Sequence, residues 1–478
     1  MKLYFIGIGG IGMSALVRYF LSKGDSVAGY DLTPSPLTHA LSEEGAVIHY
    51  EDDPELIPEP FRTKDTLVVF TPAVPRDHRE LAFFHAQANR VMKRAELLGE
   101  LTRRERGLCV AGTHGKTTTS TLLAHLLRSS HVDCHAFLGG ISNNYQTNCL
   151  ISDHSDYAVI EADEFDRSFH HLSPYIAVIT SADPDHLDIY HTPEAYRDSF
   201  EHFTSLVSAE GALVMKKGIP VTPRLKEGTR LFTYTAGADE ADFRADDIEI
   251  RDGHLFFDWH YPAIEGRPAG TLHVELGVPL LINVENAVAA MAVAYLCGAT
   301  LEELAAGVAS FRGVYRRFDR LIDDPRCVLI DDYAHHPNEL DPSIRSVREL
   351  YPDRKILGIF QPHLYSRTQD FYREFAASLD QLDEVILLDI YPARELPIPG
   401  VTSQMIADVM KHKDVLVLPK EGLLPELKKR QELPEVILMV GAGDIDRLVP
   451  QVADEIRRRL LRIEPSYATY SCSSCQLH

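Results

Sequence analysis

The sequence contains no apolar run that approaches the roughly 20 residues of a membrane-spanning helix. It also has no low-complexity segment, and its 45% hydrophobic and 25% charged residues are typical of a soluble globular protein. The apolar residues 1–6 lead directly into a glycine turn, which predicts a first strand and not a cleaved secretion signal. We therefore expect no membrane partner.

Basic residues are scarce compared with acidic ones. The chain has 48 Lys and Arg against 70 Asp and Glu, which gives a formal net charge of −22. Because proteins that bind nucleic acids usually carry a basic face, we expect no nucleic-acid partner. Anionic small molecules are not excluded, since a few local cations or a helix N-terminus suffice to hold one.

Cysteine is also infrequent, with seven residues in the chain, most of them inside apolar runs. This usage favours a reducing, cytoplasmic location. Cys472 and Cys475 could form a metal-binding or redox pair, but no second pair or histidine cluster accompanies them. We expect them to lie in a solvated tail.

The most informative stretch is residues 109–119. Apolar residues 108–111 predict a buried strand, and a helix pattern follows the loop, with its apolar face at Leu122, Leu123, Leu126 and Leu127. A loop at such a junction directs backbone N–H groups and the helix dipole at a phosphate. Lys116 can reach terminal phosphates and the Thr117 hydroxyl can hold Mg²⁺. Although Val110 replaces the first glycine of the usual pattern, the strand–loop–helix context favours an ATP site over a surface loop.

A second glycine loop lies near the start of the chain. Residues 2–8 predict a strand, residues 7–12 (GIGGIG) open a helix, and Asp31 ends the next strand about twenty residues later. This fingerprint predicts a diphosphate at the helix N-terminus and a ribose hydroxyl on the acid. Alone it fits a nicotinamide dehydrogenase, and it fits a nucleotide-sugar equally well.

Two further strands, predicted at 157–160 and 176–180, both end in acidic turns. In parallel α/β sheets the carboxyl ends of strands share one edge, so these turns should lie beside Lys116 and Thr117. Carboxylates gathered around a triphosphate repel it unless cations lie between them, which implies Mg²⁺. We expect Glu161 and His186 to ligate it, although an imidazole is an unusual ligand for this ion.

The C-terminal third contains four apolar strands, predicted at 328–330, 356–360, 385–388 and 436–440, each followed by polar residues. His335, His363 and Arg367 follow such strands, and repeated His and Arg at strand ends favour a functional edge over structural loops. The fold class is therefore α/β with three domains. They are an N-terminal Rossmann-like domain (1–106), a central P-loop ATPase-like domain (107–312), a C-terminal Rossmann-like domain (313–465) and a tail (466–478). The central sheet is expected to be mostly parallel, with a small antiparallel sheet from about 211 to 273.

Over essentially its whole length the chain resembles the Mur ligase family. The motifs that carry the resemblance are GIGGIGMS (7–14), GTHGKT (112–117), EADE (161–164), DH (185–186), RRFDR (316–320), DYAHHP (332–337), FQPH (360–363), YPA (391–393) and PIPG (397–400). The ATP loop is shared with folylpolyglutamate synthases, and the first and third motifs narrow the resemblance to enzymes that act at the muramate level.

The resemblance implies ATP-dependent amide bond formation in peptidoglycan precursor synthesis. The carboxylate of UDP-N-acetylmuramate would become an acyl phosphate, which the amine of L-alanine then attacks. The implied cofactors are ATP, as a substrate, and two Mg²⁺ ions. The oligomeric state, monomer or homodimer, stays open.

The resemblance also assigns residues. It implies catalytic roles for Lys116, Glu161, His186, His335 and Arg367. It implies ATP binding by Gly112, Thr113, His114, Gly115, Lys116, Thr117, Thr118, Asn283, Asn286, Arg317 and Asp332. It implies UDP-sugar binding by Gly9, Gly10, Ile11, Gly12, Asp31 and Thr71. It implies amino-acid binding by His335, His363 and Arg367, and metal binding by Thr117, Glu161 and His186.

Several positions depart from the family pattern. Ile282 stands where relatives have a histidine before the first adenine-binding asparagine, and Leu364 removes a possible charge near the amino acid. Phe200 occupies the position of the modified lysine that sister ligases use as a metal ligand. Either Lys216 or Lys217 serves instead, or the chain does without this group, which is the alternative that we favour.

Three other functions fit part of the pattern. An enzyme of the same fold that attaches a tripeptide to the same UDP-sugar would need only a wider acceptor pocket. A nicotinamide dehydrogenase would leave the Gly-Lys-Thr loop and both acidic turns unexplained. A non-catalytic nucleotide-binding regulator would not need the intact lysine and metal-site acids.

Replacing Lys116 with alanine should abolish turnover and leave UDP-sugar binding nearly unchanged, because the two ligands occupy different domains. ADP release and calorimetric titration with the UDP-sugar measure the two properties separately. Equal loss of both would show that the domain assignment is wrong.

Overall fold

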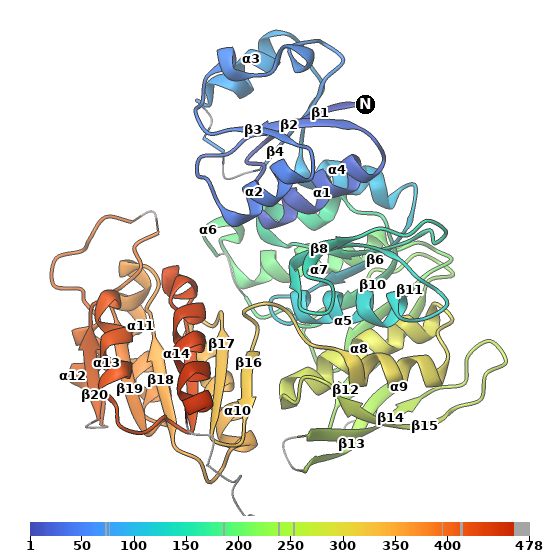
Figure 1. Ribbon diagram of the computed structural model, residues 1–478. Helices are drawn as coiled ribbons and strands as arrows, with labels where there is room; N and C mark the ends of the chain where they lie inside the picture. The colour runs from blue at the N-terminus through green and yellow to red at the C-terminus, as the bar shows by residue number, and fades with distance from the viewer. Residues whose placement is uncertain are drawn as a thin grey trace, which may run out of the picture. The chain divides into compact units, whose positions relative to one another are not determined.

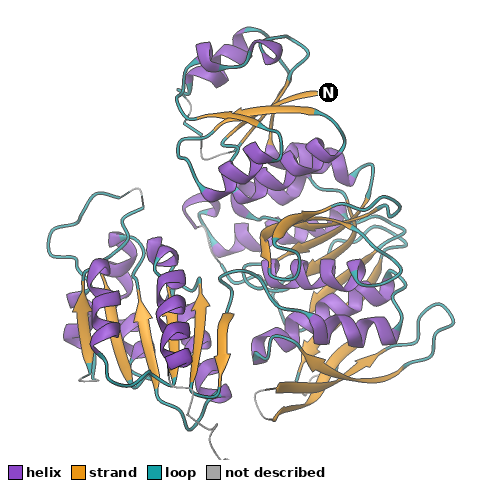
Figure 2. Cartoon of the chain, viewed as in Figure 1, coloured by secondary structure: helices purple, strands orange, loops and turns teal. Residues whose placement is uncertain are grey.

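The computed structural model describes residues 1–71, 74–75, 77–184, 187–237, 240–251, 254–393, 395–411 and 414–462. The chain divides into two compact units, residues 1–315 and 316–478. Three β-sheets with helices on their faces make up the described chain, two in the first unit and one in the second (Figures 1 and 2). This is the α/β architecture with three sheets that the sequence predicts.

The N-terminal sheet has five parallel strands, β1 (Lys2–Ile6), β2 (Ser26–Tyr30), β3 (Val47–His49), β4 (Leu67–Phe70) and β5 (Val91–Lys93), in the order β3-β2-β1-β4-β5. Its helices are α1 (Ile11–Ser22), α2 (Pro36–Glu43), α3 (Arg79–Ala86) and α4 (Arg94–Thr102), with short 3-10 turns at Pro54–Leu56 and Glu59–Phe61. Side chains alternate across a strand, so β1 directs Leu3 and Phe5 toward the apolar sides of α1 and α4 and Tyr4 and Ile6 toward α3.

The second sheet has ten strands: β6 (Arg106–Ala111), β7 (His135–Ser142), β8 (Thr147–Leu150), β9 (Tyr157–Glu161), β10 (Pro174–Ile179), β11 (Ala212–Lys216), β12 (Arg230–Ala236), β13 (Phe243–Arg251), β14 (His254–Tyr261) and β15 (Gly270–Leu276). Their order is β15-β14-β13-β12-β11-β10-β6-β9-β7-β8. The helices are α5 (Lys116–Arg128), α6 (Leu187–Tyr190), α7 (Pro193–Leu206), α8 (Leu281–Leu296) and α9 (Leu301–Ser310), with a 3-10 segment η3 (Phe165–His171).

Strand β6 lies between β9 and β10 and is parallel to both. Val110 is paired with Glu161, and Ala111 with Ile179. The loops that follow these three strands therefore leave the sheet at one edge. This confirms that the phosphate loop and the first acidic turn share an edge, and the segment that leads into the second acidic turn leaves the sheet at the same edge.

The prediction of short antiparallel strands throughout residues 211–273 is wrong for β11 and β12. Both continue the parallel part of the sheet, as does the pairing of β12 with β13. Within this segment only the pairs β13–β14 and β14–β15 are antiparallel, and they belong to the same continuous sheet. Strand direction depends on how each connection crosses the sheet, and the local pattern of apolar residues does not contain this information.

A single apolar core joins the first two sheets. Helix α1 packs against the N-terminal sheet and also against β7 and β8 of the second sheet. Its buried residues Met13 and Leu16 belong to the same cluster as Phe5 of the first sheet and Ile160 of the second. The glycine loop before α1 is therefore held against the second sheet.

The second unit contains a six-stranded sheet of β16 (Asp319–Asp324), β17 (Cys327–Asp332), β18 (Ile356–Phe360), β19 (Glu384–Leu388), β20 (Val415–Leu418) and β21 (Val436–Val440), in the order β16-β17-β21-β18-β19-β20. Its helices are α10 (Pro337–Leu350), α11 (Tyr365–Leu379), α12 (Gln404–Val409), α13 (Leu423–Lys429) and α14 (Val449–Arg462), with 3-10 turns at Lys420–Gly422 and Asp444–Arg447. The four predicted strands are β17, β18, β19 and β21, and all are buried. The edge strands β16 and β20 were not predicted. Both are partly exposed; β16 has only two consecutive apolar residues, and β20 is a short run of four.

No helix in the part of the chain described here combines the length and apolarity that crossing a bilayer requires. The described cysteines are free, and four of the five are buried. Cys472, Cys475 and the tail lie outside the described residues.

A buried polar cluster lies under α3, on the face of the first sheet opposite α1. The Tyr4 hydroxyl donates to Glu80 Oε2 at 2.7 Å and lies 2.7 Å from His49 Nε2. The Glu80 side chain is fully buried. Burial raises the pKa of Glu80 from its usual value near 4.5 to about 7, although the Tyr4 hydroxyl opposes this shift.

This pKa predicts a pH dependence of stability. Between about pH 4.5 and 7 the folded protein holds a proton that the unfolded chain has lost, so the Glu80 contribution to stability falls as pH rises. In Glu80→Gln this loss is absent. We expect the free energy of unfolding of the variant, relative to the wild type, to rise by roughly 1–3 kcal/mol between pH 5 and 8. Urea unfolding at both pH values measures it, with exposed Glu43→Gln as control, and a difference independent of pH would contradict the assignment.

Candidate active site

The loop between β6 and α5 adopts the conformation that a phosphate loop needs. Gly112 and Gly115 have φ angles of +144° and +81°, which side chains rarely allow. A Cβ atom at Gly112 would also lie 2.0 Å from Thr180 Oγ1. No side chain caps α5 at Gly115, so the first-turn N–H groups, at Lys116, Thr117 and Thr118, can receive an anion.

Lys116 is held over this loop by an internal anion. Its Nζ donates to the Gly112 carbonyl at 2.6 Å and forms an ion pair with Glu164 Oε2 at 2.8 Å. Glu164 is buried, and burial raises its pKa against the opposing effect of Lys116. A bound triphosphate could take over the ammonium from Glu164.

The loop is also tied to the segment that follows β10. The His114 N–H donates to Ser181 Oγ at 2.8 Å, and the Thr113 hydroxyl donates to the Asp183 carbonyl at 2.7 Å. This segment leads into the second acidic turn. Asp185 and His186 lie outside the described residues.

Thr117 and Glu161 approach two adjacent residues of β7. A Cβ atom at Gly139 would lie 2.2 Å from Glu161 Oε2, and one at Gly140 would lie 3.0 Å from Thr117 Cγ2. Two adjacent glycines thus leave room for both side chains. A hydroxyl and a carboxylate are oxygen donors of the kind that Mg²⁺ prefers, so the residues present fit this ion.

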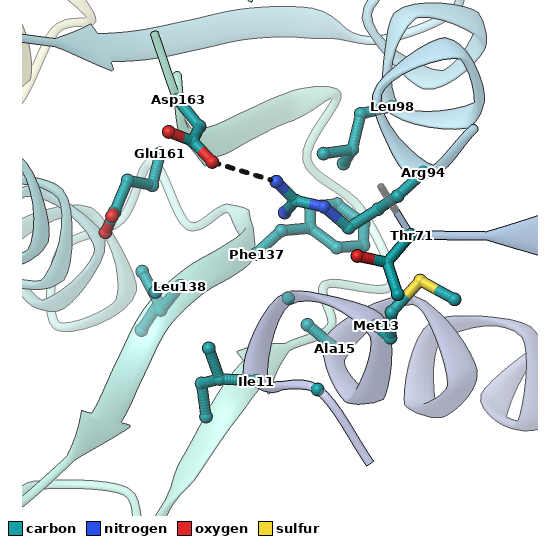
Figure 3. A pocket seen from close by; sticks show the side chains of 13 residues that line it. Ile11, Met13, Ala15, Thr71, Arg94, Leu98, Phe137, Leu138, Glu161 and Asp163 are labelled. Carbon is teal, nitrogen blue, oxygen red and sulfur yellow. Dashed lines mark hydrogen bonds and ion pairs between the residues drawn. The ribbon is translucent and has the colours of Figure 1, made fainter. Parts of the chain in front are cut away.

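A cavity of about 270 Å³ connects the glycine loop with Glu161. Figure 3 shows α1 on one side of it and the strand that carries Leu138 on the other, with Glu161 and Asp163 beyond. We call the side of the cavity next to α1 the first wall. It is lined by Gly10, Ile11 and Gly12, and Thr71 also lines the cavity. Four of the six residues predicted to bind the UDP-sugar thus share one cavity with the predicted metal ligand Glu161.

The other two, Gly9 and Asp31, contact each other. The Gly9 N–H donates to Asp31 Oδ2 at 2.7 Å, and the Thr33 N–H donates to Oδ1 at 3.2 Å. No side chain caps α1 at Gly10. The glycine loop therefore already holds one carboxylate, which indicates that its N–H groups suit an anion.

Arg94, which the sequence reasoning missed, crosses the cavity. Its Nη2 lies 3.5 Å from Asp163 Oδ2, and a Cβ atom at Gly12 would lie 2.3 Å from its Nη1 (Figure 3). The neighbouring Lys93 pairs with Asp166 at 2.7 Å. The available signal was a basic pair at the carboxyl end of a parallel strand, where ligands bind.

The two predicted adenine-binding asparagines lie at the start of α8 and are buried. Asn286 Nδ2 donates to Asn283 Oδ1 at 3.1 Å, and the Thr119 hydroxyl donates to Asn286 Oδ1 at 3.1 Å. A Cβ atom at Gly115 would lie 2.7 Å from that oxygen. Asn286 thus supports the phosphate loop, and the side chain of Ile282 beside the pair is exposed.

The structure describes two residues that bear on the modified lysine of sister ligases. Phe200 is fully buried in the core. Lys216 forms an ion pair with Glu285 of α8 at 2.7 Å.

In the second unit, the three residues predicted to bind an amino acid lie together. The rings of His335 and His363 are 5.7 Å apart, Arg367 Nη1 is 3.3 Å from His363 Nδ1, and Tyr391 stacks on His363. Burial, together with the nearby His335 and Arg367, lowers the pKa of His363 to about 4. Burial also lowers the pKa of His335. Near neutral pH the cluster therefore combines two uncharged imidazoles with one guanidinium.

Asp332 and Arg317 support the turn that carries this cluster. Asp332 accepts the Phe318 N–H at 3.2 Å and the Ser343 hydroxyl at 2.6 Å, and burial raises its pKa. The Arg317 guanidinium lies 5.0 Å from the centre of the Tyr333 ring.

Three models of protein-family domains match most of the chain. Residues 2–106 match the model of the Mur ligase family catalytic domain, residues 110–294 the Mur ligase middle domain, and residues 316–445 the Mur ligase glutamate ligase domain. A UDP-N-acetylmuramate–L-alanine ligase from Porphyromonas gingivalis is 64% identical over 94% of this chain and 97% of its own. The chain belongs to the Mur ligase family.

Other relatives support the same family assignment. A UDP-N-acetylmuramate–L-alanine ligase from Parabacteroides distasonis is 59% identical over 96% of this chain and 97% of its own. The crystal structure of a UDP-N-acetylmuramate–alanine ligase from Thermotoga maritima has a TM-score of 0.79 at 29% identity, covering 96% of this chain and all of that one. A murein peptide ligase from Psychrobacter arcticus, at 22% identity and a TM-score of 0.65, shares the fold.

Family membership makes the chain an ATP-dependent ligase. It decides against the dehydrogenase that the glycine loop alone would allow, and against the non-catalytic regulator. In this Mur ligase the glycine fingerprint and the phosphate loop are parts of one enzyme.

Replacing Gly139 with alanine should inactivate the Mur ligase without unfolding it. The new Cβ would lie within 2.2–2.5 Å of the Glu161 carboxylate oxygens, which are the flexible end of a side chain and can move aside. We expect ADP release to fall by about 10- to 100-fold, as for a misplaced catalytic group. Gly422→Ala, where the nearest atoms are 3.7 Å from the new Cβ, is the control. Unchanged ADP release in Gly139→Ala would show that the position of Glu161 is unimportant.

Proposed function

We propose that this Mur ligase joins L-alanine to the carboxylate of UDP-N-acetylmuramate, with conversion of ATP to ADP and phosphate, in peptidoglycan precursor synthesis. The relatives that are 59% and 64% identical carry this activity in their names. The observation that carries the proposal is the cavity that leads from the glycine loop to Glu161. A nucleotide-sugar that is bound at one end can present its carboxylate at the other.

The diphosphate of the UDP-sugar would bind at the start of α1. The N–H groups of Ile11 and Gly12 in the loop of Gly9 to Gly12, with the helix dipole, supply positive charge there, and Arg94 adds a guanidinium. Asp31, which already contacts Gly9, would accept a ribose hydroxyl, and Thr71 would contact the ligand from the end of β4.

ATP would bind at the phosphate loop, with Lys116 released from Glu164 to the terminal phosphates and the asparagines Asn283 and Asn286 toward the base. Thr117, Glu161 and His186 would hold the divalent cations, which supply charge neutralisation between the triphosphate and the sugar carboxylate. We propose that Arg317 and Asp332 act on the nucleotide from the second unit.

The reaction then needs two displacements. An oxygen of the muramoyl carboxylate attacks the γ-phosphorus and ADP leaves, which gives an acyl phosphate. The amine of L-alanine attacks the acyl carbon, phosphate leaves, and the amine proton is lost. Arg367 would hold the amino-acid carboxylate beside His363, and the uncharged imidazole of His335 can accept that proton.

ADP release in the presence of UDP-N-acetylmuramate tests the function, with L-alanine, glycine, L-serine and the tripeptide supplied in turn. We expect the highest kcat/KM with L-alanine and no turnover with the tripeptide. ADP release with the tripeptide alone would identify the recycling enzyme instead, and the absence of turnover with every acceptor would overturn the proposal.

Removing the Arg94 guanidinium should weaken binding of the UDP-sugar selectively. A hydrogen bond to a charged group contributes about 1.5–3 kcal/mol, so we expect Arg94→Ala to raise KM for the UDP-sugar by roughly 10- to 100-fold and to leave KM for ATP unchanged. Arg90→Ala, which removes a more exposed arginine paired with Glu100, is the matched control. An equal rise of both KM values would contradict this role.

A further inference from the structure

A polar clamp crosses the apolar layer between the two sheets of the first unit. Asn148 of β8 is fully buried, and its side-chain amide is bonded on both sides. Its Nδ2 donates to the Ile11 carbonyl at 2.6 Å and to Ser14 Oγ at 3.0 Å, and its Oδ1 accepts from Arg18 Nη1 at 2.6 Å. All three partners belong to α1.

The partners form one stripe along the helix. Ile11, Ser14 and Arg18 are spaced by three and four residues, so they lie on the face of α1 that meets β8. Ser14 Oγ also donates to the Ile11 carbonyl at 2.8 Å. Arg18 is fixed in turn by Glu44, whose two carboxylate oxygens accept from its Nε and Nη2 at 2.8–3.0 Å.

Hydrogen bonds constrain the helix in a way that its apolar contacts do not. Apolar contact depends on buried area and has little direction, so it tolerates a small slide of α1 along its axis. The three bonds of Asn148 depend on distance and angle and lose strength when the helix shifts. A buried amide with lost partners is also costly, which opposes such a shift.

The clamp lies close to both walls of the cavity. Ile11 lines the first wall and adjoins Gly10 and Gly12 of the glycine loop. On the other side, β8 pairs with β7, which carries Gly139, and β7 pairs with β9, which ends in Glu161. Asn148 thus connects the wall that holds the glycine loop to the wall that holds Glu161.

We infer that Asn148 is a positioning residue that sets the distance between the bound UDP-sugar and the phosphoryl-transfer edge. This inference rests on the proposed function. A misplacement of about 1 Å can lower the rate of an oriented reaction by about 100-fold. Each substrate alone would still bind, because neither half of the site is altered.

The test separates binding from turnover. In Asn148→Ala we expect kcat to fall by about 10- to 100-fold, with the Kd values for UDP-N-acetylmuramate and for a non-hydrolysable ATP analogue each unchanged within about 3-fold. Asn148→Asp keeps the shape and the Arg18 contact but cannot donate to Ile11, and should lose kcat similarly. Ser14→Ala removes one acceptor of the Asn148 amide, and the bond from the hydroxyl to the Ile11 carbonyl, and should give a smaller fall.

Ser152→Ala is the matched control, because it removes a buried 2.7 Å hydrogen bond to Asp133 beyond the same strand without touching α1. We expect it to lower the Tm and to keep kcat. If Asn148→Ala does not fold, Asn148→Asp and Ser14→Ala decide. Wild-type kcat in the folded Asn148 variants, or an equal fall of kcat in Ser152→Ala, would overturn the inference. Absence of ADP release from the wild-type enzyme would instead overturn the proposed function.

Discussion

Electrostatic repulsion between two anionic groups is the constraint around which the second sheet is arranged. Two unit charges about 4 Å apart repel by about 4 kcal/mol at an effective dielectric constant of 20, and a triphosphate beside a carboxylate exceeds this. At one edge of parallel strands lie the N-terminus of α5 and Lys116, and in the proposed function the oxygen atoms of Thr117 and Glu161 would hold cations between the two anions. The Lys116–Glu164 ion pair balances the charge of the lysine before a ligand arrives.

In the proposed function, helix α1 would bring the second substrate to the same edge. Its N-terminus faces the cavity, and its body is packed between two sheets, so the glycine loop belongs structurally to both. Most of the stability of this layer comes from burial of apolar side chains, which is roughly proportional to area. The geometry comes from a few directional contacts, of which the bonds of Asn148 and the Arg94–Asp163 contact are the clearest. Burial thus holds the layer together, and hydrogen bonds set its alignment.

Much of the fold and of the candidate site of this enzyme could be predicted from local sequence patterns. The phosphate loop and the glycine loop were predicted because each needs a strand, glycines and a helix within a short span. The four buried strands of the second unit were predicted because fully buried parallel strands are continuous apolar runs. The direction of strands and the strands at sheet edges were harder to predict from the sequence. Strands β11 and β12 proved to be parallel, and the edge strands β16 and β20 were missed. Arg94 and Asn148 carry no local signal of comparable strength, because their partners lie 69 and 137 residues away along the chain.

The sequence by itself determined which groups could bind phosphate, metal and amino acid, since these properties reside in residue types at short spacings. Only the tertiary structure decided which of these groups meet. The alignment of Val110 with Glu161, the approach of Thr117 and Glu161 to two adjacent glycines, and the cavity between α1 and β7 all depend on strand order and on packing of helices. Strand order and packing are set by the balance of burial, twist and chain connection over hundreds of residues, and no short segment encodes that balance.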